Sequence, residues 1–480
     1  MTPYLQPKPS AGRTLCRRAR DHHKRERGAA SLIVVMVLFF IMSLVAAYTS
    51  RNLIFEQRTS VNQYRATQAY ETAEAGLEWA IAQLNGGRID ANCLEAGVTT
   101  ANTSFRQRYL AINANPPPDA NSGMVTGLTQ PAVGAAPPAP RRAGCVWDGT
   151  RWVCSCPSDS DPALALPAGT GIFPAFWVSF STAGVTRPGV IQIIANGCTR
   201  VDTACLSSSA NTSNVEGRAL VTALVALRGA VATPPVAALT VFGSVVRDPL
   251  VLTQLSVFNT DIERGGVTIQ ASDAVSTSRV TFGSAPGTPG SESIIPNDNT
   301  MRDVANPLLM PADLTAAGRT ASDRAFASTI GIWPNASRWQ PSAVRLTCPG
   351  GGCRAALSNA VALNPDRVIW VEGDLTLETA GDIGSLPNPA DLTVAGPAVI
   401  IATGNLIVVP AAAGVRVFGM VYTRNGGWVG AGEIQGAAIV EGNLAATAAQ
   451  TVVYNGGVLD TLRLRAGSFV RVPGGWRDFP

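Results

Sequence analysis

The chain has 480 residues, which is long enough for a sizeable core and for two or three folding units. Charged residues make up only 15% of it and glycine and proline are abundant (47 and 33 residues), a composition that favours a β-rich exported protein over a helical cytosolic enzyme. Residues 1–28 hold eight basic and two acidic residues, so the formal net charge of +4 falls to about −2 for the rest, which argues against a nucleic-acid-binding body.

Residues 1–28 form a basic leader, and the 22 residues after it, 29–50, carry no charge. As a helix this segment would be about 33 Å long, enough to cross a bilayer. The basic flank predicts that the N-terminus stays in the cytoplasm and that the rest of the chain lies on the other side. A cleaved secretory signal, cut near Val45-Ala46-Ala47, is an alternative interpretation.

Residues 51–84 have the pattern of a helix that continues from the membrane span. They contain no proline and one glycine, and apolar residues recur at helical spacing. Asn85-Gly86-Gly87 predicts the end of the helix. A helix over residues 29–84 would be about 84 Å long, which is ordinary in a filament subunit and unusual in a globular core. The apolar stripe, which could also serve only to pack against the body, comprises Ile54, Val61, Ala69, Ala73, Leu77, Ile81 and Leu84.

This N-terminal region resembles that of PilX-type minor pilins of type IV pili. The resemblance covers residues 25–85 and is carried by Arg-Gly-Ala-Ala, the uncharged segment and FEQRTSVNQYRATQAYETAEAGLEWA (residues 55–80). It implies that a prepilin peptidase on the cytoplasmic side cuts between Gly28 and Ala29. It also implies that Ala29 becomes the first, methylated residue of the mature chain.

One position departs from the pattern of major pilins, which carry a glutamate five residues into the mature chain. Here that position is Ile33. A carboxylate inside the hydrocarbon is costly and is retained only for function, so its absence removes an assembly contact with a neighbouring subunit. The resemblance therefore implies a subunit at the tip of the filament, unless this subgroup of pilins simply varies at that position.

Residues 86–230 are expected to form a pilin-like β domain with disulfides. Strands are predicted at residues 176–180, 190–194 and 219–227. CVWDGTRWVCSCP (residues 145–157) predicts a hairpin, because Asp148-Gly149 is a turn signal between two hydrophobic runs. The Pro-, Ala- and Gly-rich residues 115–140 predict a long surface excursion.

Eight cysteines remain when Cys16 is set aside with the leader, an even number typical of disulfides formed in an oxidising compartment. Cys198 with Cys205, and Cys348 with Cys353, are predicted pairs because each would close a short loop. Their spacing does not fit a zinc site, so no metal is expected. The remaining four, whose pairing stays open, are Cys93, Cys145, Cys154 and Cys156.

Residues 231–480 alternate short β-branched runs with glycines, and several units repeat a strand, a Gly/Asn/Asp turn and a second strand. The repeating units are 367–377, 398–409, 419–430 and 436–446, with further candidates at 238–246, 255–262 and 266–272. This pattern predicts a β-solenoid-like C-terminal region, interrupted by a more helical stretch at residues 304–360. A β-sandwich remains the alternative. The expected fold class is α+β, a long transmembrane and amphipathic helix followed by a mostly-β body.

β-Solenoids often cleave polysaccharides with carboxylates, so the acidic residues of this region are candidates for a catalytic site. The candidate cluster is Asp366, Arg367, Glu372 and Asp374, although solvent-facing acids at a turn are the simpler interpretation. No histidine follows His23, which excludes a histidine-based triad after processing, and no Walker loop is present. No enzyme activity and no cofactor are therefore expected.

Two oxygen-rich loops, residues 159–162 and 297–303, could hold calcium, but solvated loops are the simpler interpretation. Four tryptophans could line a carbohydrate- or partner-binding surface or pack in the core: Trp333, Trp339, Trp428 and Trp476.

Together these patterns predict a minor pilin of a Gram-negative bacterium, held in the inner membrane with a periplasmic body and then incorporated at or near the pilus tip. The expected partners are other minor and major pilins, the prepilin peptidase, the inner-membrane assembly platform and a tip adhesin, with no nucleic acid. The alternative is a membrane-anchored solenoid that binds or cleaves extracellular polysaccharide.

Overall fold

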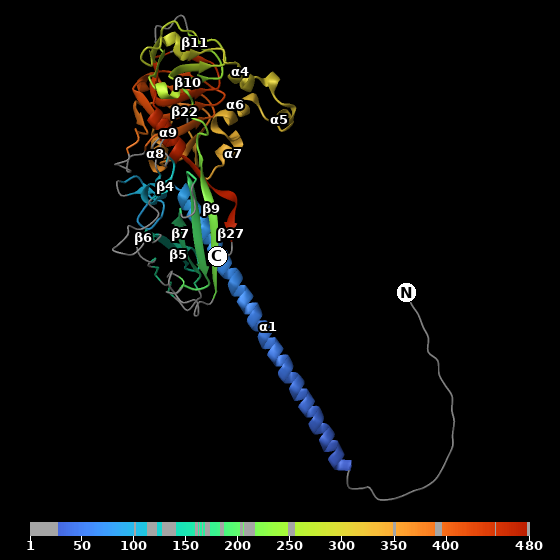
Figure 1. Ribbon diagram of the computed structural model, residues 1–480. Helices are drawn as coiled ribbons and strands as arrows, with labels where there is room; N and C mark the ends of the chain where they lie inside the picture. Colours follow the sequence, from blue (N-terminus) through green and yellow to red (C-terminus); the bar gives the residue numbers. More distant parts are fainter. Residues whose placement is uncertain are drawn as a thin grey trace, which may run out of the picture. The chain divides into compact units, whose positions relative to one another are not determined.

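The protein is described from a computed structural model (Figure 1). The structure describes residues 27–477 except 100–101, 113–121, 127–140, 159–161, 163, 166, 169–172, 183–186, 202–204, 206–216, 248–254, 349–351, 389–395 and 447. The leader before residue 27 and most of the excursion at 115–140 thus lie outside the described residues. The chain divides into two units, Met1–Tyr64 and Arg65–Pro480.

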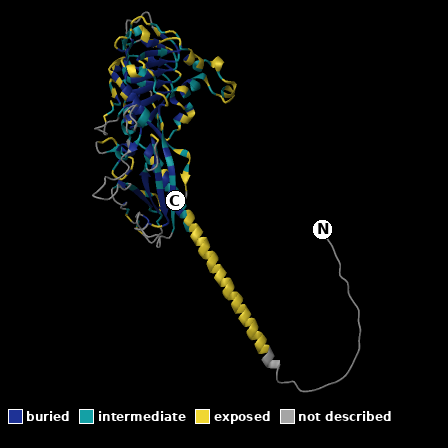
Figure 2. Cartoon of the chain, in the orientation of Figure 1, coloured by how far each residue is buried: buried dark blue, intermediate teal, exposed yellow. Residues whose placement is uncertain are grey.

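Helix α1 extends over Arg27–Asn85, 59 residues, and contains the helix expected at 29–84. It is uninterrupted because no proline occurs within it, and it ends before Gly86-Gly87. Gly87 is required by a close approach, since a Cβ atom there would be 2.8 Å from the carbonyl oxygen of Leu363. In the first unit every described side chain from Ser31 to Tyr64 is exposed, as the yellow helix in Figure 2 shows.

In the second unit, the remainder of α1 packs on a six-stranded antiparallel sheet of order β27-β9-β8-β7-β5-β6. The expected hairpin is confirmed, with Cys145 opposite Cys154 and Trp147 opposite Trp152. The strands of this sheet are β5 (Arg142–Trp147), β6 (Trp152–Ser158), β7 (Ala175–Ser181), β8 (Val190–Cys198), β9 (Arg218–Gly229) and β27 (Gly467–Arg477).

Gly197 on β8 allows α1 to lie unusually close to this sheet. A Cβ atom at that position would be 2.2 Å from the backbone nitrogen of Ala73 and 2.3 Å from the carbonyl oxygen of Ala69. Small residues on both elements thus set the distance between helix and sheet. Short elements line the loop before β5: β1 (Arg88–Ile89), β2 (Thr103–Ser104), α2 (Phe105–Tyr109), β3 (Ala111–Ile112) and β4 (Val125–Thr126).

The rest of the second unit is built on a large parallel sheet of twelve strands. Its strands are β10 (Ala237–Val241), β12 (Leu255–Asn259), β13 (Val267–Ala271), β14 (Val280–Ser284), β15 (Ile294–Ile295), β16 (Ala343–Thr347), β17 (Val368–Glu372), β19 (Gly381–Ile383), β20 (Ala398–Ala402), β22 (Val415–Thr423), β24 (Gly432–Val440) and β26 (Gln450–Tyr454). Two smaller parallel sheets consist of β18 (Leu375–Leu377), β21 (Leu406–Val408) and β23 (Trp428–Val429), and of β11 (Val245–Arg247) and β25 (Leu444–Ala446).

The order of the parallel strands departs from chain order. β16, β17, β20, β22 and β24 lie side by side in sequence order, and β24 then pairs with two strands: β26, with Gly432 opposite Gln450, and β10, with Leu239 opposite Ala438. The chain therefore enters the sheet in its middle at β10, runs outward to the edge strands β14 and β15, and returns from the opposite edge through β16.

The connection between β15 and β16 is helical, in keeping with the expectation for residues 304–360. Phe326 in this insertion packs edge-on against Trp370 of β17 and Tyr422 of β22, with ring centroids 5.8 and 5.2 Å away. Its helices are α4 (Asn299–Ala305), η4 (Pro307–Leu309), α5 (Ala312–Ala316), α6 (Ala321–Ile330) and α7 (Pro334–Arg338); the other helices are η2 (Ile262–Arg264), η3 (Gly290–Ser293), α8 (Arg354–Leu363), η5 (Pro410–Ala412) and α9 (Gly456–Arg465).

One strand differs from the sequence-based division into residues 86–230 and 231–480. β27, from the C-terminal part of the chain, completes the antiparallel sheet by pairing with β9, with Phe469 opposite Leu227. The two β regions of the second unit are thus joined by β9, α9 and β27, and the final segment belongs structurally with the earlier strands.

Candidate functional site: the long helix and its attachment

The first part of α1 exposes an apolar surface, and contact of such a surface with water is unfavourable. Leu32 is 60% exposed, Phe39 73% and Phe40 67%. Because each Å² of apolar surface removed from water stabilises by about 25 cal/mol, these side chains favour a lipid or helix neighbour. Helix Ser31–Asn85 is long and apolar enough to cross a membrane, and its most apolar window is unburied, unlike the core helix of a soluble domain.

The two residues of the expected cleavage site, Gly28 and Ala29, lie in the first turn of α1, which starts at Arg27. Their side chains are outside the described part of the structure, so cleavage between them remains a prediction. Ile33 is exposed on the same helix and brings no charge to this apolar surface.

The predicted stripe divides into two parts along the helix. Ile54 and Val61 are exposed, whereas Ile81 is half-buried. The reason is that the antiparallel sheet covers α1 only from its middle onward, so the sheet gives the later residues their partners. The fully buried members of the stripe are Ala69, Ala73, Leu77 and Leu84.

The end of α1 is held by Asn85, which joins the backbone of β27. Its side-chain amide donates to the carbonyl oxygen of Phe469 (2.9 Å) and its carbonyl oxygen accepts from the Phe469 N–H (2.8 Å). This reciprocal pair acts as one rung of a strand ladder, supplied by a side chain at a helix terminus. On the same surface Arg471 of β27 forms an ion pair with Glu78 of α1.

Arg106 of α2 completes this attachment from a fully buried position. Its guanidinium donates to the carbonyl oxygens of Leu84, Gly467 (2.7 Å) and Arg465 (3.2 Å). It also donates to the side-chain oxygen of Asn85 at 3.0 Å. Burial lowers the pKa of Arg106 to about 10. The five donors of arginine suit this ring of oxygens, which a lysine could not satisfy.

Sequence reasoning missed Asn85 and Arg106 as attachment residues. In the sequence, Asn85 with Gly86-Gly87 predicts only the end of a helix. A local signal existed for α2, since Ser104 and Gln107 form a capping box at its start. No sequence signal indicates that Arg106, which lies between them, reaches Gly467, because the two residues are 361 positions apart in the chain.

The two predicted disulfides are present, Cys198–Cys205 and Cys348–Cys353. The pairing that the sequence left open is resolved as Cys93–Cys156 and Cys145–Cys154. The first of these ties the segment after α1 to β6, and the second crosses the β5–β6 hairpin.

The candidate acidic cluster is not gathered into one site. Asp366 pairs with Arg465 (3.6 Å) and Glu372 pairs with Arg338 (2.7 Å). Arg367 donates to Asn364 at 2.6 Å, and Asp374 accepts from the backbone and side chain of Asn405. Each charged group thus has a local structural partner. Within the described ranges, no three His, Cys, Asp or Glu side chains come together as metal ligands.

The possible calcium loops carry no ion-binding arrangement in the part that is described. Asp298 caps α4 through the N–H groups of Thr300 and Met301, and Arg302 pairs with Asp273. Residues 159–161 lie outside the described residues. Of the four tryptophans, Trp428 is buried, Trp333 is half-buried, and Trp339 and Trp476 are exposed.

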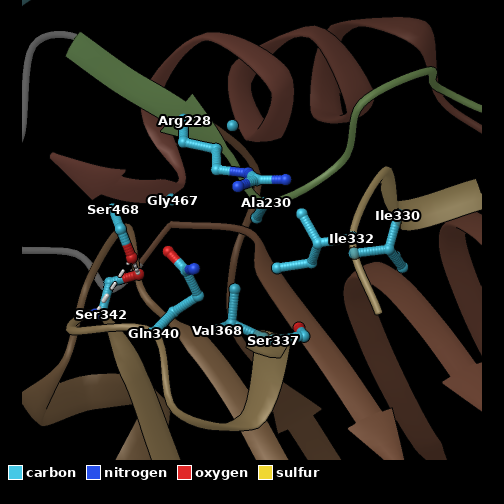
Figure 3. Close-up of a pocket in the computed structure, with 11 residues that line it drawn as sticks. Arg228, Ala230, Ile330, Ile332, Ser337, Gln340, Ser342, Val368, Gly467 and Ser468 are labelled. Carbon is cyan, nitrogen blue, oxygen red and sulfur yellow. Dashed lines mark hydrogen bonds between the residues drawn. The ribbon is translucent and has the colours of Figure 1, made fainter. Parts of the chain in front are cut away.

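A small cavity of about 20 Å³ lies where β9, α7 and β27 meet (Figure 3). Its wall carries the hydroxyls of Ser342 and Ser468, 2.6 Å apart, beside Arg228. This volume suits one water molecule rather than an organic ligand.

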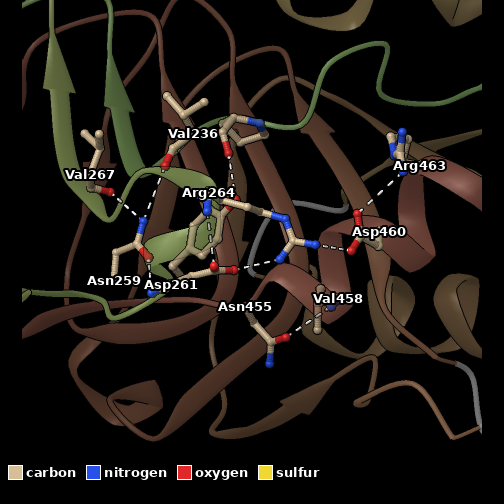
Figure 4. Close-up of polar contacts among 11 residues, drawn as sticks. Val236, Asn259, Asp261, Arg264, Val267, Asn455, Val458, Asp460 and Arg463 are labelled. Atoms are coloured by element: carbon tan, nitrogen blue, oxygen red, sulfur yellow. Dashed lines mark hydrogen bonds and ion pairs between the residues drawn. The ribbon is translucent and has the colours of Figure 1, made fainter. Parts of the chain in front are cut away.

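A second polar cluster attaches α9 to the turn after β12 (Figure 4). Arg264 bridges Asp261, at 2.6 Å, and the nearly buried Asp460 of α9. The cluster links two distant parts of the chain and leaves no free reactive group, so its role is structural.

Residues 27–78 match the family model described as PilX N-terminal. None of the curated proteins compared with the chain matches it. Among solved structures the chain is similar to the competence-associated pilin ComZ from Thermus thermophilus, with 11% identity over 86% of this chain and 97% of that one. The TM-score of 0.22 is too low for that likeness to carry an argument. Residues 27–78 therefore form a PilX-type N-terminal region, and this region includes the exposed apolar part of α1.

Proposed function

We propose that this protein is a non-enzymatic minor pilin, cut by a prepilin peptidase between Gly28 and Ala29 and incorporated at or near the tip of a type IV pilus. The observation that carries the proposal is α1 itself. One continuous helix combines a PilX-type sequence, an exposed apolar first part and a second part fixed into a β domain.

The helix would act in two stages. In the inner membrane its uncharged segment is solvated by lipid, with the body in the periplasm. During assembly the same apolar side chains exchange lipid for the helices of other pilins, at little net cost in apolar burial. Asn85 and Arg106 would then transmit load from the helix to the body through backbone hydrogen bonds.

Two features support a place at the tip. Ile33 replaces the glutamate with which major pilins contact a neighbour, and a subunit at the end of a fibre lacks one neighbour. The compact unit Arg65–Pro480 is also large for the interior of a tightly packed fibre. Immunogold labelling of the body is expected only at fibre ends, and label along the shaft would refute the tip assignment.

The partners follow from this assignment. Other minor pilins and the major pilin would contact α1, the prepilin peptidase would recognise the basic leader, and the inner-membrane platform would extract the processed subunit. The body would initiate assembly or present an adhesin at the cell surface.

Replacing Gly28 tests the role of processing. Gly28→Leu is expected to leave the leader attached and to reduce piliation strongly, whereas Gly97→Ala, at an open position in the body, serves as the control. Processing can be followed with an amine-reactive dye. Lys8 and Lys24 are the only lysines in the sequence, so the uncut variant gains two labelled side chains. Undiminished piliation in an uncut variant would count against an essential assembly role.

We also propose that the parallel strands form a β-solenoid. Successive strands pair in parallel in the order in which they occur in the chain: Gly419 of β22 lies opposite Ala398 of β20 and Gly436 of β24. Turn residues form a ladder in support, since Asp374 accepts from Asn405 and Asn405 accepts from the Gly427 N–H (2.9 Å).

Breaking this ladder tests the solenoid. Asn405→Ala is expected to lower the free energy of unfolding by about 1–2 kcal/mol through the lost hydrogen bonds. Asn335→Ala, on the surface of α7, should change it by less than about 0.5 kcal/mol. A crystal structure with a flat two-layer sandwich would overturn the assignment.

A further inference from the structure

Strand β16 forms one edge of the parallel sheet. It pairs with β17 on one side, and no described strand pairs with its other side. Its five residues, Ala343–Thr347, contain neither proline nor glycine and are only half-buried or exposed. An open edge of this kind presents unpaired N–H and C=O groups that can accept a further strand.

The other edges of the two large sheets carry features that hinder strand addition. β6 contains Pro157, and β27 contains Pro473 and a register shift. β14 and β19 each contain a glycine, and β15 has two residues. Proline, bulges and short length protect an edge, and glycine weakens a strand; β16 differs from the other edges in having none of these four features.

An exposed aromatic and a guanidinium lie together at β16. Trp339, directly after α7, is 64% exposed, and the Arg345 guanidinium lies 4.1 Å from its ring centroid. Arg338 beside it is paired with Glu372 at 2.7 Å. No carboxylate within the described part of the chain forms an ion pair with Arg345, so this exposed charge is available to an acidic group.

We propose that β16 binds an extended segment of a neighbouring pilus protein by strand addition, with an acidic side chain on Arg345 and an apolar side chain on Trp339. Backbone hydrogen bonds would supply affinity, and alternate side chains of the added segment would supply specificity. Tryptophan and arginine are the residues most often dominant in interfaces. The proposal rests on the proposed pilin function only for the identity of the partner as a pilus protein.

The test uses the full chain in detergent micelles and three labelled seven-residue peptides. One peptide alternates valine with glutamate, one alternates valine with lysine, and the third is the glutamate peptide with N-methylated backbone. We expect the glutamate peptide to bind about fivefold more tightly than the lysine peptide, as an exposed ion pair allows. N-methylation should abolish binding, because it removes the donors of the added strand.

Variants then locate the site. Arg345→Glu should reverse the preference between the two peptides, and Trp339→Ala should weaken both, while the matched surface variant Arg151→Glu should change neither. Circular dichroism verifies that each variant is folded. Absence of binding, binding that survives N-methylation, or indifference to Arg345→Glu would each overturn the proposal. If no peptide binds but mass spectrometry shows that the mature chain begins at Ala29, the docking proposal is wrong and the proposed pilin function is unaffected.

Discussion

At the scale of single residues, the attachment of the helix depends on buried polar groups rather than on its apolar stripe alone. Arg106 and Asn85 bring α1, α2 and the start of β27 together at one point. Buried polar groups of this kind are stabilising only when all partners are present, so a partial replacement is costly.

Arg106→Lys tests this point. The ammonium keeps the charge but cannot reach four oxygens in the plane of a guanidinium, so the free energy of unfolding should fall by roughly 2–4 kcal/mol. Arg151→Lys, at an exposed hairpin turn, should change it by less than about 0.5 kcal/mol. Denaturant titration of both variants in micelles measures the difference. If both were as stable as the unsubstituted chain, the hydrogen bonds of Arg106 would not be what holds α1 to β27.

The buried carboxyl group of Glu441 predicts that the free energy of unfolding depends on pH. Burial raises its pKa above the ordinary value of 4.5, although hydrogen bonds from Ser322, Tyr422 and Asn425 oppose the shift. A carboxyl group whose pKa is raised on folding contributes stability that is present below pH 4.5 and lost as pH rises through the folded value.

Stability measured from pH 4 to pH 8 should therefore fall more steeply in the native chain than in Glu441→Gln, which cannot ionise. Parallel slopes in the two proteins would mean that Glu441 makes no net contribution to this dependence.

At the scale of elements, α1, the hairpin and most strands follow from the sequence because their signals are local. The absence of proline predicts the length of α1, and Asp148-Gly149 predicts the turn between β5 and β6. The position of Arg106 does not follow, since Gly467 lies far away in the chain. The burial of the later stripe residues but not of Ile54 likewise depends on where the sheet begins to cover the helix.

Gly197→Ala tests the close approach of α1 and β8. The added methyl group would overlap the helix backbone at Ala73, so α1 must shift, at a cost of about 1–3 kcal/mol or more. Gly97→Ala has no atom within 4 Å and should be neutral or slightly stabilising. Thermal unfolding compares the two, and equal midpoints would contradict the tight packing of helix and sheet.

At the scale of the whole molecule, the sequence predicted a long helix followed by a mostly-β body, and the structure has that helix, an antiparallel sheet and a large parallel sheet. The spatial order of the parallel strands could not be predicted. The pairing of β10 with β24 joins residues about 200 positions apart, and no local pattern specifies which repeat meets which. The return of β27 to β9 is non-local for the same reason.

The most direct test of the central claim is mass spectrometry of the intact protein extracted from membranes. A pilin of the proposed kind begins at Ala29, carries one added methyl group on its N-terminus and contains no lysine, because Lys8 and Lys24 are removed with the leader. A chain that keeps residues 1–28, or one that begins near Tyr48 as a cleaved secretory signal would leave it, would contradict the account.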